Sequence, residues 1–431
     1  MKKWSKSVKV GVCLAVLAIG LGGCFVQQGG FFQKRVIEEE TAVYIQLRSG
    51  DPEEVKRGQK RVVEYDRAME DVFDRHPELR PKWKKLDPGN NGYLKLIQLA
   101  ESYEIGSRSH ESILDVPDEV RDVLYGAKKW DNDVAREYWL KEIEKINEIR
   151  SIGLMTEQSM LGSNIDYLSS NFHSEFVIRC TRLLCLDARF SAQEGNDKRA
   201  IGSLLAANGI VKHISQVEAP CLVSDVVAMI SQSEIFAAAI NDVMLTKNEI
   251  SDLRKKLKPR TNKDLGRALL GEFYVTTRAG IMPLVQSVEG RSTAYDVPDL
   301  KGMYDDHAER CKHDVKFLSR VSTRGRFTME KSHWPSYKSK EKLSKQAMEF
   351  TLDYRLDLPI YSRSYARNQI LYRYYDAVLA IMAGEEPPVE LLTGKPFVFD
   401  PVTREVEFPI DPLFVYPVTE ILKVPHERVN Q

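Results

Sequence analysis

Most of this chain consists of segments in which apolar residues recur every three or four positions, and this spacing constrains the fold more than any other feature. Residues three and four apart share one face of an α-helix, so the spacing predicts amphipathic helices. The segment Asp131–Ile152 shows the pattern in Trp139, Ile143, Ile146 and Ile149. We expect further helices over Phe31–Leu47, from Pro52, over Tyr93–Tyr103, Asn171–Glu194, Lys198–Ile214 and Leu222–Met244, from Thr246, and over Asp264–Gly280, Asp299–Val321, Ser344–Tyr354 and Ser362–Ala383.

Two of these helices are expected to pack as a hairpin. The turn Gly195-Asn196-Asp197 joins a segment containing Asp187-Ala188 to one containing Ala200-Ile201. This pattern resembles a tetratricopeptide-like hairpin, in which small residues allow close helix packing. No tandem copies recur at the period of roughly 34 residues that such arrays show. Gly266 and Gly271 also lie inside a predicted helix, where glycine costs about 1 kcal/mol against alanine, so we expect close packing at both.

Strand-like sequence occurs only near the C-terminus. Pro396–Phe399 and Glu405–Phe408 flank Asp400-Pro401-Val402-Thr403, with proline at the second turn position. We expect a β-hairpin there, with Leu413–Tyr416 as an additional edge strand. The predicted fold is therefore mostly α, built from packed helical hairpins that are tetratricopeptide-like in part, with a small C-terminal β-hairpin.

The N-terminal residues have the three parts of a secretory signal. Four lysines precede an apolar run, Val10–Leu21, which is shorter than the roughly 20 residues that cross a bilayer. Leu21-Gly22-Gly23-Cys24 then resembles the lipobox of bacterial lipoproteins. That resemblance implies a diacylglycerol on the Cys24 thiol, with acyl chains such as palmitate, and cleavage before Cys24. The alternative is plain secretion without lipid.

The net charge of the chain bears on its expected partners, and the residue after Cys24 bears on its expected location. Removing four signal lysines from 62 basic residues leaves 58 against 62 acidic ones, so the mature chain has a net charge of about −4. With the export signal, this argues against nucleic acid. Phe25 follows Cys24 where aspartate would, by resemblance, signal inner-membrane retention. We expect a lipid-anchored protein of the cell envelope, on the outer membrane facing the periplasm if the cell has two membranes.

A further resemblance covers roughly residues 90–410, a span estimated from the order of predicted elements. Leu186-Asp187-Ala188-Arg189, Glu194-Gly195-Asn196, Arg267-Ala268-Leu269 with Gly271-Glu272, and Thr393-Gly394-Lys395-Pro396 before Asp400-Pro401 occur in this order. The order is similar to a group of uncharacterised, mostly helical bacterial envelope proteins. It implies an architecture and no mechanism.

The pattern divides the chain into six parts. They are a signal peptide at 1–23, a lipidated tether at 24–30, an N-terminal helical region at 31–160, a central helical domain at 161–322, a basic exposed connector at 323–342, and C-terminal helices with the hairpin at 343–431. A mature chain of this length can bury a substantial core and suggests two or three domains.

The best candidate for metal binding is the face formed by His307, Cys311 and Asp314, at i, i+4 and i+7 of a predicted helix. Nitrogen, sulfur and oxygen ligands suit zinc, but no second ligand pair with zinc spacing occurs. A polar helix flank with a half-buried thiol is the preferred interpretation, and no metal or cofactor is expected. Four cysteines follow Cys24 in the mature chain: Cys180, Cys185, Cys221 and Cys311. We interpret them as buried free thiols, with disulfides as the alternative.

Charged and aromatic residues in the predicted helices have two interpretations each. Arg179, Arg182, Asp187, Arg189 and Glu272 could line a catalytic cleft, but interhelical pairs or solvated faces are favoured because buried charge needs a partner.

The last long helix and the segment that leads into it are rich in tyrosine and arginine, which are enriched at interaction sites. Packing of the tyrosines on neighbouring helices is the simpler interpretation. The residues concerned are Tyr361, Tyr365, Tyr372, Tyr374, Tyr375, Arg363, Arg367 and Arg373.

The sequence contains no G-x-S-x-G, H-E-x-x-H or phosphate-binding glycine loop. We therefore predict a non-catalytic role, as a membrane-anchored lipoprotein that binds a protein partner or acts as a scaffold in the cell envelope. The alternative is an envelope enzyme, such as a hydrolase acting on cell-wall material, whose site lacks a recognisable motif.

Overall fold

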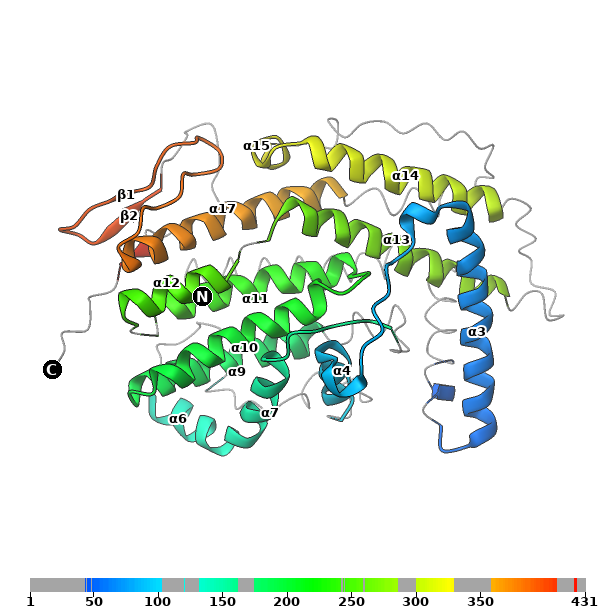
Figure 1. Ribbon diagram of the computed structural model, residues 1–431, viewed down its shortest axis with the longest axis horizontal. Coiled ribbons are helices and arrows are strands. Elements are labelled where there is room, and N and C mark those ends of the chain that lie inside the picture. The colour runs from blue at the N-terminus through cyan, green and yellow to red at the C-terminus, as the bar shows by residue number, and fades with distance from the viewer. Residues whose placement is uncertain are drawn as a thin grey trace, which may run out of the picture.

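The structure is a computed structural model that describes residues 43, 45–47, 49–102, 120, 132–161, 174–241, 243, 245–258, 260–285, 300–328, 358–408 and 422–424. The predicted signal peptide, Cys24, the tether and most of Phe31–Leu47 lie outside these residues, as do Ser344–Tyr354 and Leu413–Tyr416. The predicted fold class is confirmed, since the described part is mostly helical with a small antiparallel sheet near the C-terminus (Figure 1).

The described helices and strands follow the predicted order along the chain. They are α3 (Pro52–Arg75), the short 3₁₀ helices η1 (Pro77–Leu79) and η2 (Pro88–Asn90), α4 (Gly92–Ser102), α6 (Asn132–Lys141), α7 (Ile143–Gly153), α9 (Ser174–Gln193), α10 (Asp197–Ser215), α11 (Leu222–Asn241), α12 (Lys247–Lys256), α13 (Asn262–Val285), α14 (Leu300–Arg320), α15 (Thr323–Phe327), α17 (Leu358–Ala383), β1 (Val398–Phe399), β2 (Glu405–Glu407) and β3 (Leu422–Lys423).

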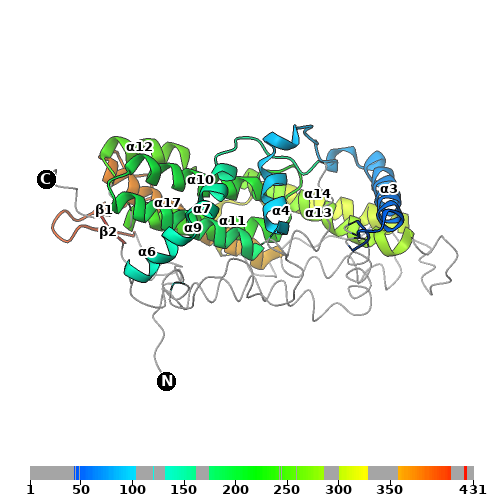
Figure 2. The same cartoon turned by 90° about the horizontal axis from the view of Figure 1, so that it is seen from below.

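The helices are stacked in an elongated array. The hairpin of α9 and α10 packs on α11, and α11 in turn contacts α13 and α17 (Figure 1). Helix α14 lies along α13, and α3 crosses both at one end of the molecule. The sheet lies at the opposite end in both views (Figure 2). Among the described elements, the array therefore separates α3 from the small sheet near the C-terminus.

Capping residues fix several helix ends as the sequence predicts. The Asp51 carboxylate accepts a hydrogen bond from the Glu53 backbone N–H, which starts α3 at Pro52. Thr246 and Glu249 form a reciprocal capping box at the start of α12. Gly195 adopts a positive φ of 77° in the turn between α9 and α10, a conformation that glycine reaches without strain.

The prediction of one continuous helix over Asp131–Ile152 is wrong. Helix α6 ends at Lys141 and α7 begins at Ile143, with Glu142 between them at φ −97° and ψ 10°. The break lets both short helices direct apolar side chains into the same core, from Tyr138 and Trp139 on α6 and Ile146 and Ile149 on α7. Apolar spacing continues through such a break, so the spacing alone does not reveal it.

The prediction of an exposed connector is also wrong at its start, where the chain forms a helix with buried residues. Residues Thr323–Phe327 form helix α15, in which Arg326 is fully buried and Phe327 is 8% exposed. The Arg326 guanidinium donates to the carbonyl oxygen of Val321 and to Gln369 Oε1, at 3.1 and 2.9 Å. These hydrogen bonds compensate for the burial of the charge. The rest of the predicted connector lies outside the described residues.

Two glycines allow a close contact between α7 and α10. A Cβ atom on Gly209 would lie 1.7 Å from the carbonyl oxygen of Gly153, and one on Gly153 would lie 2.3 Å from that of Ala206. Close packing is also confirmed at Gly271, where a Cβ would meet the Pro220 carbonyl oxygen at 2.0 Å. The prediction of close packing is wrong for Gly266, since nothing lies within 4 Å of a Cβ atom added there.

The predicted β1–β2 hairpin is confirmed, with Val398 opposite Glu407 and Phe399 opposite Val406. The third described strand is Leu422–Lys423, later in the chain than the edge strand we expected. Tyr374 of α17 holds the sheet, because its hydroxyl donates to the Val406 carbonyl and accepts from the Leu422 N–H, at 2.7 and 2.8 Å. The sheet is thereby fixed to the C-terminal half of α17.

Helix α11 is the one described helix long and apolar enough to cross a membrane by length and composition. In the structure it contacts α9, α10, α13 and α17, and 61% of its most apolar window is buried inside the protein. These contacts are those of a core helix, and the criterion of length and composition alone is weak evidence for a membrane span.

Candidate functional site

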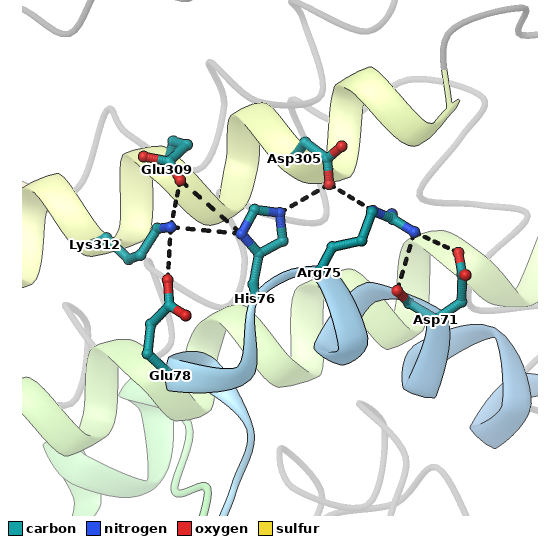
Figure 3. Close-up of polar contacts among 7 residues, drawn as sticks. All are labelled: Asp71, Arg75, His76, Glu78, Asp305, Glu309 and Lys312. Atoms are coloured by element: carbon teal, nitrogen blue, oxygen red, sulfur yellow. Dashed lines mark hydrogen bonds and ion pairs between the residues drawn. The ribbon is translucent and has the colours of Figure 1, made fainter.

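The densest group of interacting ionisable side chains among the residues described lies where the end of α3 meets α14. His76 caps the C-terminus of α3 and directly precedes Pro77, the first residue of η1. This break turns the histidine side chain toward α14, where it is 7% exposed (Figure 3). We call the group the His76 network; it comprises Asp71, Arg75, His76, Glu78, Asp305, Glu309 and Lys312.

Asp305 is the central acceptor on one side of the imidazole. Its Oδ1 atom lies 2.8 Å from His76 Nε2 and accepts a second hydrogen bond of 2.8 Å from Arg75 Nε. An ionised carboxylate only accepts hydrogen bonds, so Nε2 carries the hydrogen in this contact. Arg75 also binds Asp71, one turn earlier on α3. One carboxylate of α14 thus binds the last two side chains at the end of α3.

Lys312 and Glu309 lie on the other side of the ring. Lys312 Nζ is 3.5 Å from His76 Nδ1 and 2.6 Å from Glu78 Oε1, and it also binds Glu309. Glu309 Oε1 is 4.0 Å from Nδ1. Acidic and basic groups therefore alternate through the network, and His76 contacts both kinds (Figure 3).

Hydrogen bonds within the network favour the charged forms of Asp305, Glu78 and Lys312. Burial would raise the pKa of Asp305, but hydrogen bonds from Arg75 and His76 outweigh it and lower the pKa. The hydrogen bond from Lys312 lowers the pKa of Glu78. Burial opposes ionisation of Lys312, but its hydrogen bonds to Glu309 and Glu78 raise its pKa. The charges therefore persist at neutral pH and hold α3 against α14.

Chemically, the His76–Asp305 pair has two uses. A histidine oriented by a carboxylate is the arrangement of a general base, which needs substrate within hydrogen-bond reach. The same pair, shared between two helices and tied to arginine and lysine, is also an interhelical ion-pair network. The low exposure of His76 and the occupation of both ring nitrogens by protein groups favour the second use.

The structure directs the metal candidates His307 and Cys311 toward α13. His307 Nε2 lies 3.1 Å from Thr276 Oγ1 and its ring lies 5.0 Å from that of Phe273, while Cys311 Sγ points to the Leu269 carbonyl oxygen at 3.7 Å. Asp314 Oδ1 instead contacts His313 Nδ1 at 3.2 Å. Burial lowers the pKa of His307 to about 4 and raises that of Cys311. Within the described ranges, no three or more His, Cys, Asp and Glu side chains are placed to hold a metal ion.

Charged residues in the apolar helices form pairs between helices, as predicted. Arg182 of α9 binds Glu234 of α11, with Nε 3.0 Å from Oε1. Asp187 of α9 is fully buried, and its Oδ1 accepts from Arg199 Nη2 and Trp139 Nε1, both at 2.8 Å. Glu272 behaves differently, since its Oε2 accepts from the Leu222 backbone N–H at 2.9 Å and caps α11.

Arg179 and Arg189, the remaining two arginines of this set, are half-buried on α9. Arg182, Asp187 and Glu272 therefore provide interhelical and capping contacts. Burial raises the pKa of Glu272 to about 7. The cause of this rise is desolvation of the Glu272 carboxyl group in a helix contact.

Packing of the tyrosines on neighbouring elements is confirmed for α17. The hydroxyl of Tyr361 binds Asp225 and that of Tyr365 donates to the Thr261 carbonyl at 2.5 Å, while Tyr372 binds the Met229 carbonyl. Tyr375 stacks on Phe236 with ring centroids 6.0 Å apart. The four cysteines among the described residues, Cys180, Cys185, Cys221 and Cys311, are not in disulfide bonds, and all but the half-buried Cys185 are buried.

The sequence did not reveal the His76 network. His76 and Asp305 are 229 residues apart, and His76-Pro77 gives only the signal of a helix break. Asp305, Glu309 and Lys312 do have the spacing of one helix face, which is a signal for paired charges. It does not indicate which distant element completes them.

No family model matches this chain, and no curated protein or solved structure shows significant similarity to it. The site must therefore be interpreted from its own geometry.

Proposed function

We propose that this chain is a lipid-anchored protein of the cell envelope that binds a protein partner or acts as a scaffold through its helical body. The observation that carries the proposal is the lysine-rich start, the short apolar run and Leu21-Gly22-Gly23-Cys24. One acyl chain gives only reversible membrane binding, whereas the several chains of a lipoprotein anchor stably.

The arrangement of charges in the body supports a non-catalytic role. Asp187 and Arg182 each bind partners on neighbouring helices, and Glu272 caps a helix. Active sites, in contrast, collect titratable groups that face a substrate. Because α3 is the described long helix nearest to Cys24 in the sequence, the His76 network would transmit the attachment at the membrane to α14 and the rest of the array.

The alternative function, a hydrolase acting on cell-wall material, is favoured by one observation. His76 Nε2 and Asp305 Oδ1 are 2.8 Å apart, which is the geometry of a histidine base and its orienting carboxylate. In that case His76→Ala would abolish hydrolysis of cell-wall fragments by the purified protein. The interaction proposal expects no such hydrolysis by the native chain.

Proximity crosslinking in native envelopes tests the interaction proposal. We would compare the native chain with Cys24→Ala, using Gln27→Ala as a control that alters the tether and keeps the thiol. We expect a specific set of crosslinked proteins with the native chain and the control, and its loss with Cys24→Ala. The same set with Cys24→Ala, or no specific set with any chain, would contradict an anchored interaction role.

A further inference from the structure

The third strand of the small sheet is held by side chains as well as by its neighbouring strand. Strand β3 lies along the outer edge of β2, with Lys423 opposite Glu405. Regular antiparallel strands are joined by main-chain hydrogen bonds. Here the side chains of Tyr374 and Arg404 also bind the main chain of residues 422–424. The edge of β2 therefore has the features of a binding site for an extended chain.

Tyr374 binds the first residue of this segment. The side chain comes from α17 and is fully buried. Its hydroxyl donates to the Val406 carbonyl at 2.7 Å and accepts from the Leu422 N–H at 2.8 Å, so it bridges β2 and β3. Because the contact on β3 is made to a backbone N–H, it requires an extended chain at this position but no particular side chain.

Arg404 binds the last residue of the segment at two points. Its carbonyl oxygen accepts from the Val424 N–H, and its Nε donates to the Val424 carbonyl, both at 2.8 Å. Among the described residues, Arg404 is the one non-glycine residue with a positive φ, at 58°. Residues other than glycine adopt this conformation at an energetic cost, so it persists where contacts fix it. In this conformation both the carbonyl and the side chain of Arg404 face Val424.

The side chains of the segment give the site its selectivity. Alternate residues of a strand point to opposite faces, so positions 422 and 424 share one face. Val424 is 6% exposed and belongs to the main apolar cluster, on which Leu422 also packs. On the other face, Lys423 Nζ lies 3.0 Å from Glu405 Oε1. The edge of β2 therefore accepts an extended segment with the pattern apolar–basic–apolar.

The chain's own segment uses two of these positions incompletely. Leu422 is only half-buried, and the Lys423 side chain is 65% exposed. A larger apolar residue at the first position would bury more surface, and arginine at the second can bind a carboxylate with two parallel hydrogen bonds. A second copy of this chain offers the identical segment, so exchange between copies forms no better contact and costs the entropy of association. A different protein is therefore the favoured occupant.

We propose that the edge of β2 is the docking site for an extended apolar–basic–apolar segment of a protein partner, and that residues 422–424 occupy it until the partner displaces them. We call this surface the β2 edge site; it comprises Tyr374, Arg404, Glu405 and Val406. Main-chain hydrogen bonds supply the affinity and the side-chain positions supply the selectivity, as in other cases of strand addition. The inference deepens the proposed function and rests on it, because that function supplies the partner.

Binding of a peptide to the full chain tests the β2 edge site. The probe is a fluorescein-labelled peptide, Thr-Glu-Ile-Leu-Lys-Val-Pro-His-Glu, with the sequence of residues 419–427. Val424→Asp places a charge at a buried position, so the chain's own segment should leave the site. Fluorescence anisotropy should show that this variant binds the peptide at least about tenfold more tightly than the native chain, in which the attached segment competes.

Matched variants locate the binding. Val402→Asp changes an 89% exposed valine in the β1–β2 turn and should bind the peptide as weakly as the native chain. Arg404→Asn, added to Val424→Asp, removes the guanidinium group, and asparagine still tolerates a positive φ. We expect this addition to weaken binding about tenfold, because a charged hydrogen bond to the peptide is lost.

The peptide and the fold need controls of their own. A peptide with glutamate in place of its lysine should bind the Val424→Asp chain more weakly, because it meets Glu405 with a like charge. Circular dichroism would verify that each variant keeps the native helix content. Lys423→Glu, which repels Glu405 from an exposed position, would replace Val424→Asp if that variant fails to fold.

The outcomes separate the β2 edge site from the other proposals. No peptide binding by the Val424→Asp chain would overturn the site, and so would equal binding with and without Arg404→Asn. Concentration-dependent dimers of the native chain that Arg404→Asn abolishes would make a second copy the occupant and overturn the partner proposal. Because the measurement does not involve the anchor, its failure would leave the crosslinking test of the proposed function intact. Peptide binding without specific crosslinks in envelopes would contradict the proposed function and keep the site.

Discussion

At the scale of single residues, Asp187 shows how the array tolerates a charge in its core. The carboxylate is fully buried, yet it binds Trp139 of α6 and both Arg199 and Ser203 of α10. A buried carboxylate with this many donors is stable, whereas the donors left behind after its removal are costly. Asp187 therefore joins three helices.

We expect Asp187→Ala to lower the free energy of unfolding by about 2 to 4 kcal/mol, because Trp139 and Ser203 lose a buried acceptor and Arg199 loses its counter-charge. Urea denaturation measures the change. The control is Glu194→Ala, which breaks the exposed Arg136–Glu194 pair and should cost no more than about 1 kcal/mol. Equal effects of the two substitutions would show that Asp187 does not have this role.

Glu272 should make stability depend on pH. Burial raises its pKa from 4.5 to about 7, so between these values the folded chain holds a proton that the unfolded chain has released. Its contribution to stability is therefore fully present below pH 4.5 and is lost as the pH rises through 7. Glu272→Gln stays neutral and can still accept from the Leu222 N–H.

The variant should consequently gain stability relative to the native chain as the pH rises through this window. His307 titrates there with the opposite sign, because its pKa is lowered to about 4, but it cancels in the difference between the two proteins. Urea titrations at a series of pH values measure the difference. A difference that stays constant from pH 4.5 to 7 would contradict the assignment.

Residue types predicted some of these roles and missed others. Asp187 and Glu272 were recognisable from sequence as charges in apolar helices, since such groups need partners. Their partners were not recognisable, because they lie on other helices. Arg199 is 12 residues from Asp187, and Leu222 is 50 residues from Glu272. The role of His76 depends on a contact across 229 positions, which no local pattern encodes.

At the scale of elements, the α7–α10 contact depends on Gly209. We expect Gly209→Ala to cost about 3 kcal/mol or more, because the new methyl group would overlap the Gly153 carbonyl and separate the helices. The matched change is Gly266→Ala in α13, where the space is open and the better helix propensity of alanine should add up to about 1 kcal/mol. Thermal unfolding measures both, and a neutral Gly209→Ala would contradict the close contact.

The His76 network should determine how firmly α3 is docked. Asp305→Asn keeps the size of the side chain but removes the charge that binds Arg75 and His76, so α3 should separate from α14 more often. We expect amide hydrogen exchange in Pro52–Arg75 to become about tenfold faster, with α9 and α10 unchanged. Lys60→Ala, on an exposed part of α3, is the control. Unchanged exchange in α3 would mean that apolar packing alone holds it.

Element positions were largely predictable because apolar spacing and caps are local. Pro52 and the Thr246 capping box each marked a helix start correctly. The break at Glu142 and the short helix α15 were missed, because both depend on tertiary packing. Arg326 and Phe327 are buried where α15 packs on α17. Their neighbours in the sequence, in contrast, are typical of an exposed basic segment.

At the scale of the whole molecule, the main apolar cluster crosses the boundaries expected from the sequence. It contains Leu96 from the N-terminal region, Phe176 and Ile235 from the central domain, and Tyr374 and Val406 from the C-terminal part. The helices at one end, α3, α13 and α14, share a second cluster that includes Phe73, Phe273 and Tyr304. The described helices thus form one continuous body joined by two apolar clusters.

The central claim is that this body is held to a membrane through lipid on Cys24, and metabolic labelling with an alkyne-bearing palmitate tests it most directly. The native chain and Cys24→Ala are produced in a bacterium with lipoprotein processing, and the label and the membrane fraction are measured for each. We predict label and membrane attachment for the native chain, with both lost in the variant. Equal labelling of the two, or a native chain found unlabelled in the soluble fraction, would contradict the account.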